Sequence, residues 1–254
     1  LFGNEHPNVS ILYNNLGQVC SSLANYSMAL DYFNKALAVN KICMGGYHPE
    51  VAAIYNNIGY VYSLQGNYPL SLENYKKALD IFEIYFSSNN SNVATLYNNI
   101  GRVYYEQGLY AEALEYHNKA LMIQEEIFGL EHPNVAMSFN NLSQICHSQG
   151  NYSLALEYSN KALLIEEKVL GIDHPNVARI YNNIGSLYVS IDDYPLALDN
   201  FNKALTILEK NFGSDHPDVA TLHNNIGSVY SSLNNHSLAL DNYNKALTIL
   251  EKNF

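Results

Sequence analysis

The feature that most constrains the fold is a strict repetition, with a step of 42 residues, that runs through the whole chain of 254 residues. The dipeptide His-Pro returns at this interval, and a pair of asparagines returns with it. No step contains an insertion or a deletion. Repetition with such a period indicates an array of small units, each of which buries its apolar face against the next. His-Pro stands at 6–7, 48–49, 132–133, 174–175 and 216–217, and Asn90-Ser91 holds its place in the remaining copy.

Each copy predicts two amphipathic helices. In the first copy, Pro7 stands at the first helical position, where its missing N–H removes no needed donor. Apolar residues then recur at spacings of three and four, the period of a helix with one apolar face. We expect the first helix to end near Ala24 and the second to run from about Ser27 to Met44. In copy five the second helix is expected over about 195–212.

A small residue in the middle of each first helix, glycine in five copies, predicts that the two helices of a copy approach closely. Glycine costs a helix interior about 1 kcal/mol relative to alanine, so its return in five of the six copies needs a packing reason. The position holds Gly17, Gly59, Gly101, Gly185 and Gly227, with Ser143 in copy four.

The charge balance excludes several functions. The net charge is -11, and no basic stripe is present, which argues against binding to nucleic acid or to an anionic membrane. No apolar run is long enough to span a bilayer. Three cysteines at no metal-like spacing predict reduced thiols, with Cys20 and Cys146 in place of core tyrosines. We expect a cytoplasmic protein without a cofactor or metal.

Catalysis is not expected either. The His-Pro histidines lie at successive helix starts, about 10 Å apart if the helices pack normally. They are therefore too far apart to share one metal ion, whose ligand distances are about 2 Å. No phosphate-binding loop, nucleophile elbow or zinc-protease helix motif is present.

One stretch of copy two carries a family resemblance. Tyr55-Asn56-Asn57-Ile58-Gly59 is followed by Tyr62, Gly66, Tyr68, Leu72, Tyr75 and Lys77-Ala78-Leu79. This pattern resembles the tetratricopeptide repeat, whose usual period of 34 is here extended by about two helical turns, as in kinesin light chains. The resemblance implies an all-α, right-handed superhelical solenoid of six helix pairs, one domain over 1–254. The repeats are 6–47, 48–89, 90–131, 132–173, 174–215 and 216–254, and 1–5 is the tail of a preceding repeat.

The same resemblance implies a peptide-binding role for the second asparagine of each pair. In the family this position, on the concave groove lined by first helices, hydrogen-bonds the backbone of an extended peptide. A carboxamide suits the role because it both donates and accepts. Alternatively, the asparagines satisfy polar groups of the next repeat. The residues are Asn15, Asn57, Asn99, Asn141, Asn183 and Asn225.

Four other side chains are candidate groove contacts. Arg102 and Arg179 are the only arginines, and both lie on first helices near a second asparagine. A guanidinium binds a carboxylate through two parallel hydrogen bonds, so we predict an acidic or C-terminal carboxylate partner. The alternative is an ordinary surface role for each arginine. The lysines and arginines of the family's carboxylate-binding members are absent. Tyr60 and Tyr105 fall outside the core positions and could contact a ligand.

The sequence therefore predicts a scaffold that binds a peptide or helix of a partner protein in its concave groove, not an enzyme. Two alternatives stay open. The chain could be the regulatory or sensor arm of a larger protein whose catalytic or nucleotide-binding domain lies outside it. It could also be a structural array that associates end to end with other copies.

Overall fold

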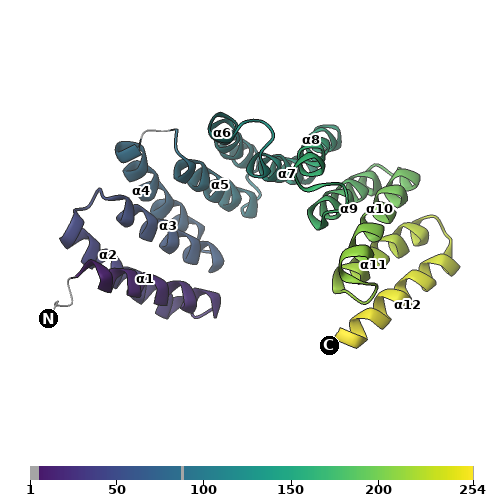
Figure 1. Ribbon diagram of the computed structural model, residues 1–254, viewed down its shortest axis with the longest axis horizontal. Helices are drawn as coiled ribbons and strands as arrows, with labels where there is room; N and C mark the ends of the chain where they lie inside the picture. Colours follow the sequence, from purple (N-terminus) through teal and green to yellow (C-terminus); the bar gives the residue numbers. More distant parts are fainter. Residues whose placement is uncertain (1–5, 87–88, 254) are drawn as a thin grey trace. The chain divides into compact units, whose positions relative to one another are not determined.

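The computed structural model describes residues 6–86 and 89–253, and over these residues the chain is entirely helical, with no strand (Figure 1). Each repeat contributes one shorter and one longer helix. The helices are α1 (Pro7–Ser22), α2 (Tyr26–Met44), α3 (Pro49–Leu64), α4 (Tyr68–Phe86), α5 (Ser91–Glu106), α6 (Tyr110–Phe128), α7 (Pro133–Ser148), α8 (Tyr152–Leu170), α9 (Pro175–Ser190), α10 (Tyr194–Phe212), α11 (Pro217–Ser232) and α12 (His236–Asn253).

The chain divides into two compact units, which we call the N-terminal unit (1–127) and the C-terminal unit (128–254). Within each unit the two helices of a repeat pack against each other, and each pair packs on the next along the chain. The predicted helix ends lie within about two residues of the observed ones. Among the described residues, no helix is both long and apolar enough to cross a membrane.

The repeated histidine is a helix cap. In α3, Nδ1 of His48 accepts the backbone N–H of Glu50 at 3.2 Å, which satisfies one of the donors left free at a helix start. Asn90 performs the same task in α5 with its side-chain oxygen, at 2.8 Å from the backbone nitrogen of Asn92. The interpretation of these histidines as helix-entry residues is confirmed. The other caps of this kind are His6, His132, His174 and His216.

The mid-helix glycines make room for an aromatic ring. A Cβ added to Gly185 would lie 2.6 Å from the ring of Phe201, a buried residue of the partner helix α10. Copy four replaces this pair by two small residues, Ser143 and Ser159, whose hydroxyl oxygens are 2.7 Å apart. The predicted close approach of the two helices is therefore confirmed. The other pairs are Gly17 with Phe33, Gly59 with Tyr75, Gly101 with His117 and Gly227 with Tyr243.

The apolar positions of the first helices serve the contact between repeats. Leu12 of α1 is 62% exposed, because no described helix covers this side of α1, whereas its counterparts further along the chain are buried. Leu16 and Val19 of α1 are exposed in the same way. At the other end, Leu247 and Leu250 of α12 form an exposed apolar side. The counterparts of Leu12 are Ile54, Leu96, Ser138, Ile180 and Leu222.

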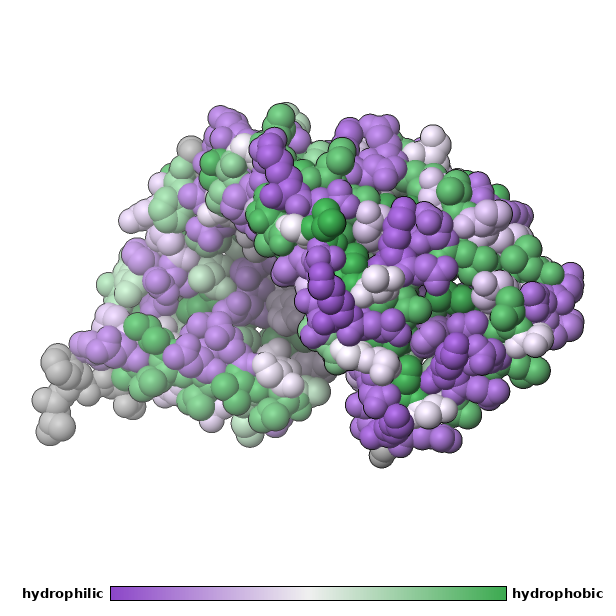
Figure 2. All heavy atoms as spheres, turned by 45° about the vertical axis from the view of Figure 1, so that its right-hand side comes forward, coloured by the Kyte–Doolittle hydropathy of each residue, from purple (hydrophilic) through white to green (hydrophobic). Residues whose placement is uncertain are grey.

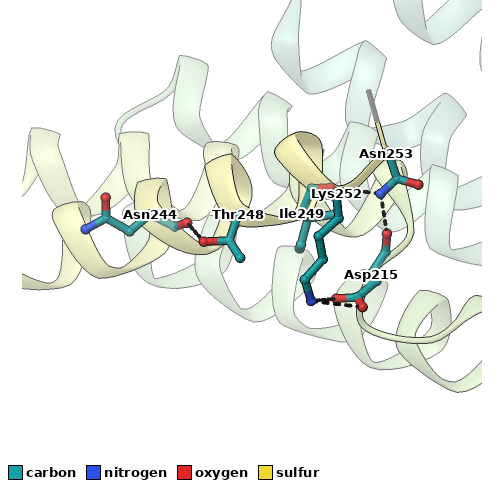
Figure 3. Close-up of polar contacts among 6 residues, drawn as sticks. All are labelled: Asp215, Asn244, Thr248, Ile249, Lys252 and Asn253. Atoms are coloured by element: carbon teal, nitrogen blue, oxygen red, sulfur yellow. Dashed lines mark hydrogen bonds and ion pairs between the residues drawn. The ribbon is translucent and has the colours of Figure 1, made fainter.

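The C-terminal unit has a polar clasp at each junction between repeats. In the last repeat, Nζ of Lys252 lies 3.0 and 3.1 Å from the two carboxylate oxygens of Asp215, and the Asn253 side chain donates to the Asp215 carbonyl at 2.8 Å (Figure 3). The clasp ties the end of a second helix to the loop that leads into the same repeat. The equivalent ion pairs are Lys210–Asp173 and Lys168–Glu131.

Two of the three cysteines are core residues, as predicted. Cys20 and Cys146 are buried, and burial raises the pKa of the Cys146 thiol. Cys43, near the end of α2, is exposed, so it does not share their packing role. Within the described residues, none of the three forms a disulfide.

Candidate binding face on the first helices

The paired asparagines form hydrogen bonds between successive repeats. In the N-terminal unit, Nδ2 of Asn57 donates to Oδ1 of Asn14 at 2.9 Å. The second asparagine of one repeat is thus tied to the first asparagine of the preceding one. The same bond recurs in both units, as Asn99 to Asn56 at 2.9 Å, Asn183 to Asn140 at 3.0 Å and Asn225 to Asn182 at 2.9 Å.

These bonds agree with the alternative interpretation, in which the asparagines satisfy polar groups of a neighbouring repeat. They use only one N–H of each second asparagine, which keeps its Oδ1 and one further N–H. The carboxamide is therefore held in a fixed orientation, and its ligand-binding role stays a prediction. Asn15 of α1 is exposed, and Asn141 of α7 is half-buried. In each unit, we call the side of the first helices that carries the second asparagines (α1, α3 and α5, or α7, α9 and α11) the asparagine face.

Arg102 lies over an aromatic ring of the preceding repeat. Its guanidinium carbon is 5.1 Å from the ring centre of Tyr60, which is itself partly exposed on α3. This distance is typical of a cation–π contact. The Nη2 atom of Arg102 is buried and has no hydrogen-bond partner among the described residues, and the same is true of the hydroxyl of the fully buried Tyr75.

The groups around Arg102 are neutral. Burial raises the pKa of Tyr75 to about 12, and the positive charge of Arg102 opposes this shift. Burial, and to a smaller extent the positive charge of Arg102, lowers the pKa of His117 to about 4. The ring of His117 is bonded through Nδ1 to Oδ1 of Asn98 at 2.8 Å. Arg102 therefore lacks a carboxylate partner within ion-pair distance among the residues that the structure describes.

Sequence reasoning missed His117 as part of this site. Its signal was present, because His117 stands at the position where the other repeats have Phe33, Tyr75, Ser159, Phe201 and Tyr243. A histidine in a core series of this kind indicates a polar neighbour on the facing helix. Tyr105, which the sequence did single out, is half-buried on α5 and packs against Tyr110, with ring centres 5.7 Å apart.

Arg179 lies at the asparagine face of the C-terminal unit. Its exposed side chain lines a cavity of about 320 Å³ between α7 and α9, which we call the Arg179 pocket. The structure thus brings Arg179 and the predicted Asn183 together. Sequence reasoning missed Gln144 and His147, because glutamine recurs at this register position only as Gln18 and no other copy has a histidine at the position of His147. The pocket is lined by Asn140, Ser143, Gln144, His147, Arg179, Asn183, Ser186 and Leu187.

The lysines differ from the arginines in how their charge is neutralised. Nine of the eleven lysines form ion pairs with carboxylates of the chain. Six of these pairs are between residues four apart on a second helix, such as Lys35 with Asp31. Over residues 6–86 and 89–253, neither Arg102 nor Arg179 has such a partner. Within the same residues, no group of three or more His, Cys, Asp or Glu side chains could hold a metal ion.

Comparison with known proteins gives a consistent result. The family profile of the tetratricopeptide repeat matches residues 1–42, 40–84, 92–165, 148–210 and 192–252. No curated protein sequence gives a match. The resemblance drawn from the repeat motif is confirmed, and so is the all-α repeat fold of consecutive helix pairs.

Several solved structures are similar to the chain. BtubC (BKLC) from P. vanneervenii is 22% identical, with a TM-score of 0.73 over 90% of this chain and 89% of that one. The nearly identical repeats of a putative kinesin light chain from Podosopora anserina give 18% identity and a TM-score of 0.71 over 82% and 98%. The apo form of RapI gives 17% and 0.69 over 96% and 98%. Identities of this size support the fold alone.

Proposed function

Because the chain belongs to the tetratricopeptide repeat family, whose repeats are generally protein–protein interaction modules, we propose that it binds an acidic segment of a partner protein along the asparagine face. The repeats of this family typically serve as scaffolds and not as enzymes. The segment is either an extended peptide or one side of a helix. In each unit one arginine, Arg102 or Arg179, binds an acidic group of such a segment.

The observation that carries this proposal is that, within residues 6–86 and 89–253, neither guanidinium has a carboxylate partner. The chain has a net charge of -11, so carboxylates are abundant, and nearly all lysines have one. A cation that lies beside buried polar atoms without a counter-charge is energetically unfavourable. A bound carboxylate would supply that counter-charge. A guanidinium also favours this ligand through its paired N–H groups.

The asparagines support an interaction with the partner's backbone. Each hydrogen bond between repeats holds a carboxamide in place, so the remaining N–H and the carbonyl oxygen of Asn57, Asn99, Asn183 and Asn225 need no ordering when a ligand arrives. Groups that are already ordered cost less entropy on binding. The partly exposed ring of Tyr60 adds an apolar contact beside Arg102.

A selection from a random peptide library displayed on phage tests the proposal. Wild-type chain should enrich peptides rich in Asp and Glu, and the double variant Arg102→Ala, Arg179→Ala should lose this enrichment. The matched control is Lys76→Ala, Lys203→Ala, which also removes one exposed cation from each unit but from second helices. Acidic peptides that bind the arginine variant as well as wild type would contradict the proposal.

End-to-end association of copies is a second candidate. It is favoured by the exposed apolar residues on the outer sides of α1 and α12, which in other repeats are the contact between neighbouring pairs. In a head-to-tail contact, the exposed Asn15 of one copy could donate to the exposed Asn224 of another. Sedimentation equilibrium should then show association that Leu12→Glu abolishes. A monomer at all concentrations would exclude this candidate.

A further inference from the structure

We infer that the Arg179 pocket binds a phosphate group, and that the partner segment therefore carries a phosphorylated side chain where it crosses the C-terminal unit. This inference rests on the proposed function, because it specifies the anion that one of the two arginines receives.

The first argument is the charge of the pocket walls. None of the eight lining residues is an Asp or a Glu, although the chain contains 24 of these residues. Other cavities in the C-terminal unit do contain them. Asp218 lines the cavity of about 300 Å³ on the other side of Arg179, and Glu209, Asp215 and Asp241 line a third one. In the view of Figure 2, the visible surface of this unit is a mixture of hydrophilic and apolar residues. The Arg179 pocket is thus locally favourable to an anion.

The second argument is the number of available donors. Arg179 offers five N–H groups, and the Gln144 amide offers two. Asn183 gives one N–H to Asn140 at 3.0 Å and keeps the other. Neither Gln144 nor Arg179 uses its side chain in a hydrogen bond within the described part of the chain. Donors from two helices therefore line one cavity.

The imidazole of His147 adds one more hydrogen-bonding group. Its Nε2 lies 2.8 Å from Oγ of Ser190, and that hydroxyl donates to the carbonyl of Ser186 at 3.1 Å. Since the single hydroxyl proton of Ser190 is used, Nε2 of His147 is the donor in this contact. Nδ1 is then the acceptor nitrogen of the ring, and it can accept a hydrogen bond from the hydroxyl of a phosphate monoanion.

These donors suit a phosphate better than a carboxylate. A phosphate monoester carries a charge of about -1.5 to -2 near neutral pH and has three strong acceptor oxygens. A carboxylate has one charge and two oxygens, which Arg179 alone could satisfy through its paired N–H groups. The cavity of about 320 Å³ also exceeds what a carboxylate needs and leaves room for the linking atoms of a phosphorylated residue.

Nuclear magnetic resonance with small anions tests the inference directly. The side-chain signals of Arg179 and His147 are followed in the whole chain during titration with inorganic phosphate, and separately with acetate at matched ionic strength. We expect saturable shifts with phosphate and binding of acetate that is weaker by at least about tenfold. Equal affinity for the two anions, or no saturable shift with phosphate, would overturn the inference.

Two variants locate the effect. Arg179→Ala removes the guanidinium, and Gln144→Glu places a carboxylate in the pocket; both residues are exposed, so the fold should be retained. Each should weaken phosphate binding at least about tenfold. The matched control is Gln18→Glu, the same change at the same register position on α1, which should bind phosphate like wild type. Undiminished phosphate binding by Arg179→Ala would place the anion elsewhere and reject the pocket.

The outcomes separate this inference from the proposed function. If acidic peptides are selected through Arg102 and Arg179 but phosphate binds no better than acetate, the binding face stands and the phosphate pocket fails. If phosphate binds in the pocket but the arginine variant selects acidic peptides like wild type, the proposed function fails.

Discussion

The N-terminal and C-terminal units share one repeat pattern but differ at the junctions between repeats. In the C-terminal unit, every repeat has an ion pair there, Lys252–Asp215 (Figure 3), Lys210–Asp173 or Lys168–Glu131. In repeat two of the N-terminal unit, the same two register positions hold Ile84 and Tyr47, both strongly exposed. The helix pairs form in either case. The fold therefore depends on the buried repeat positions, and the junction residues are free to vary.

The units also differ around their arginines. In the N-terminal unit, Arg102 is half-buried against Tyr60 and beside His117. In the C-terminal unit, Arg179 is exposed and faces amide and hydroxyl groups across an open pocket. The same repeat fold thus places the Arg102 guanidinium among aromatic rings and the Arg179 guanidinium among polar groups. Under the proposed function, the two units would therefore contact chemically different groups of a ligand.

The largest expected difference between the units is their response to acid. The pKa of His117 is lowered to about 4 in the folded chain, from about 6.5 when unfolded. A group with a lowered pKa contributes stability that is present above pH 6.5 and is lost as the pH falls towards 4. The free energy of unfolding of the N-terminal unit should fall by up to about 3 kcal/mol over this range. Faster hydrogen exchange in α5 and α6, corrected for intrinsic rates, measures this loss.

The variant His117→Phe is the control for this acid response. Phenylalanine stands at the same register position in Phe33 and Phe201, above a glycine, so the variant should fold. It removes the titrating group, and the exchange of α5 and α6 should then depend on pH no more than that of α9 and α10. An unchanged acid response in this variant would assign the effect to another group.

A smaller effect is expected from filling the space above a mid-helix glycine. In Gly185→Ala the new methyl group would lie 2.6 Å from the ring of Phe201, which is buried and cannot turn outward. Overpacking should exceed the gain in helix propensity, for a net loss of about 1–2 kcal/mol in the free energy of unfolding. Urea unfolding measures this loss.

Copy four provides the comparison for Gly185→Ala. Gly101→Ala, which meets the ring of His117 at 2.7 Å in the N-terminal unit, should cost a similar amount. Ser143→Gly only removes small atoms and should cost mainly the two hydrogen bonds of the serine hydroxyl, about 1 kcal/mol. If Gly185→Ala stabilised the chain, the close-packing explanation of these glycines would be wrong.

The smallest effect is expected from introducing the polar clasp of the C-terminal unit into the N-terminal unit. The double variant Tyr47→Asp, Ile84→Lys would give the N-terminal unit the ion pair of the C-terminal unit. Because the side chains of the existing pair are more than half exposed, we expect a coupling energy of about 0.5 kcal/mol. A double-mutant cycle by urea unfolding measures it, with Asp215→Ala and Lys252→Ala as the reverse cycle. A coupling above about 2 kcal/mol would show that the clasps do determine stability.

Much of the fold could be predicted because its causes are local. The His-Pro caps, the spacing of the apolar residues and the glycine in the middle of a first helix each act within one or two helical turns, and the strict 42-residue period returns these positions in all six copies. Helix ends follow from these signals to within about two residues. The sequence also placed both arginines and all second asparagines on first helices.

What surrounds each candidate residue was decided by tertiary structure alone. The bond from Asn57 to Asn14 joins residues 43 apart, and the contacts of Arg102 come from three other helices. The Arg179 pocket depends on Gln144 and His147, which follow no repeat pattern. A period in the sequence specifies which residues take equivalent positions, but hydrogen bonds, charge partners and cavities depend on distances between side chains from different helices, and only packing sets those distances.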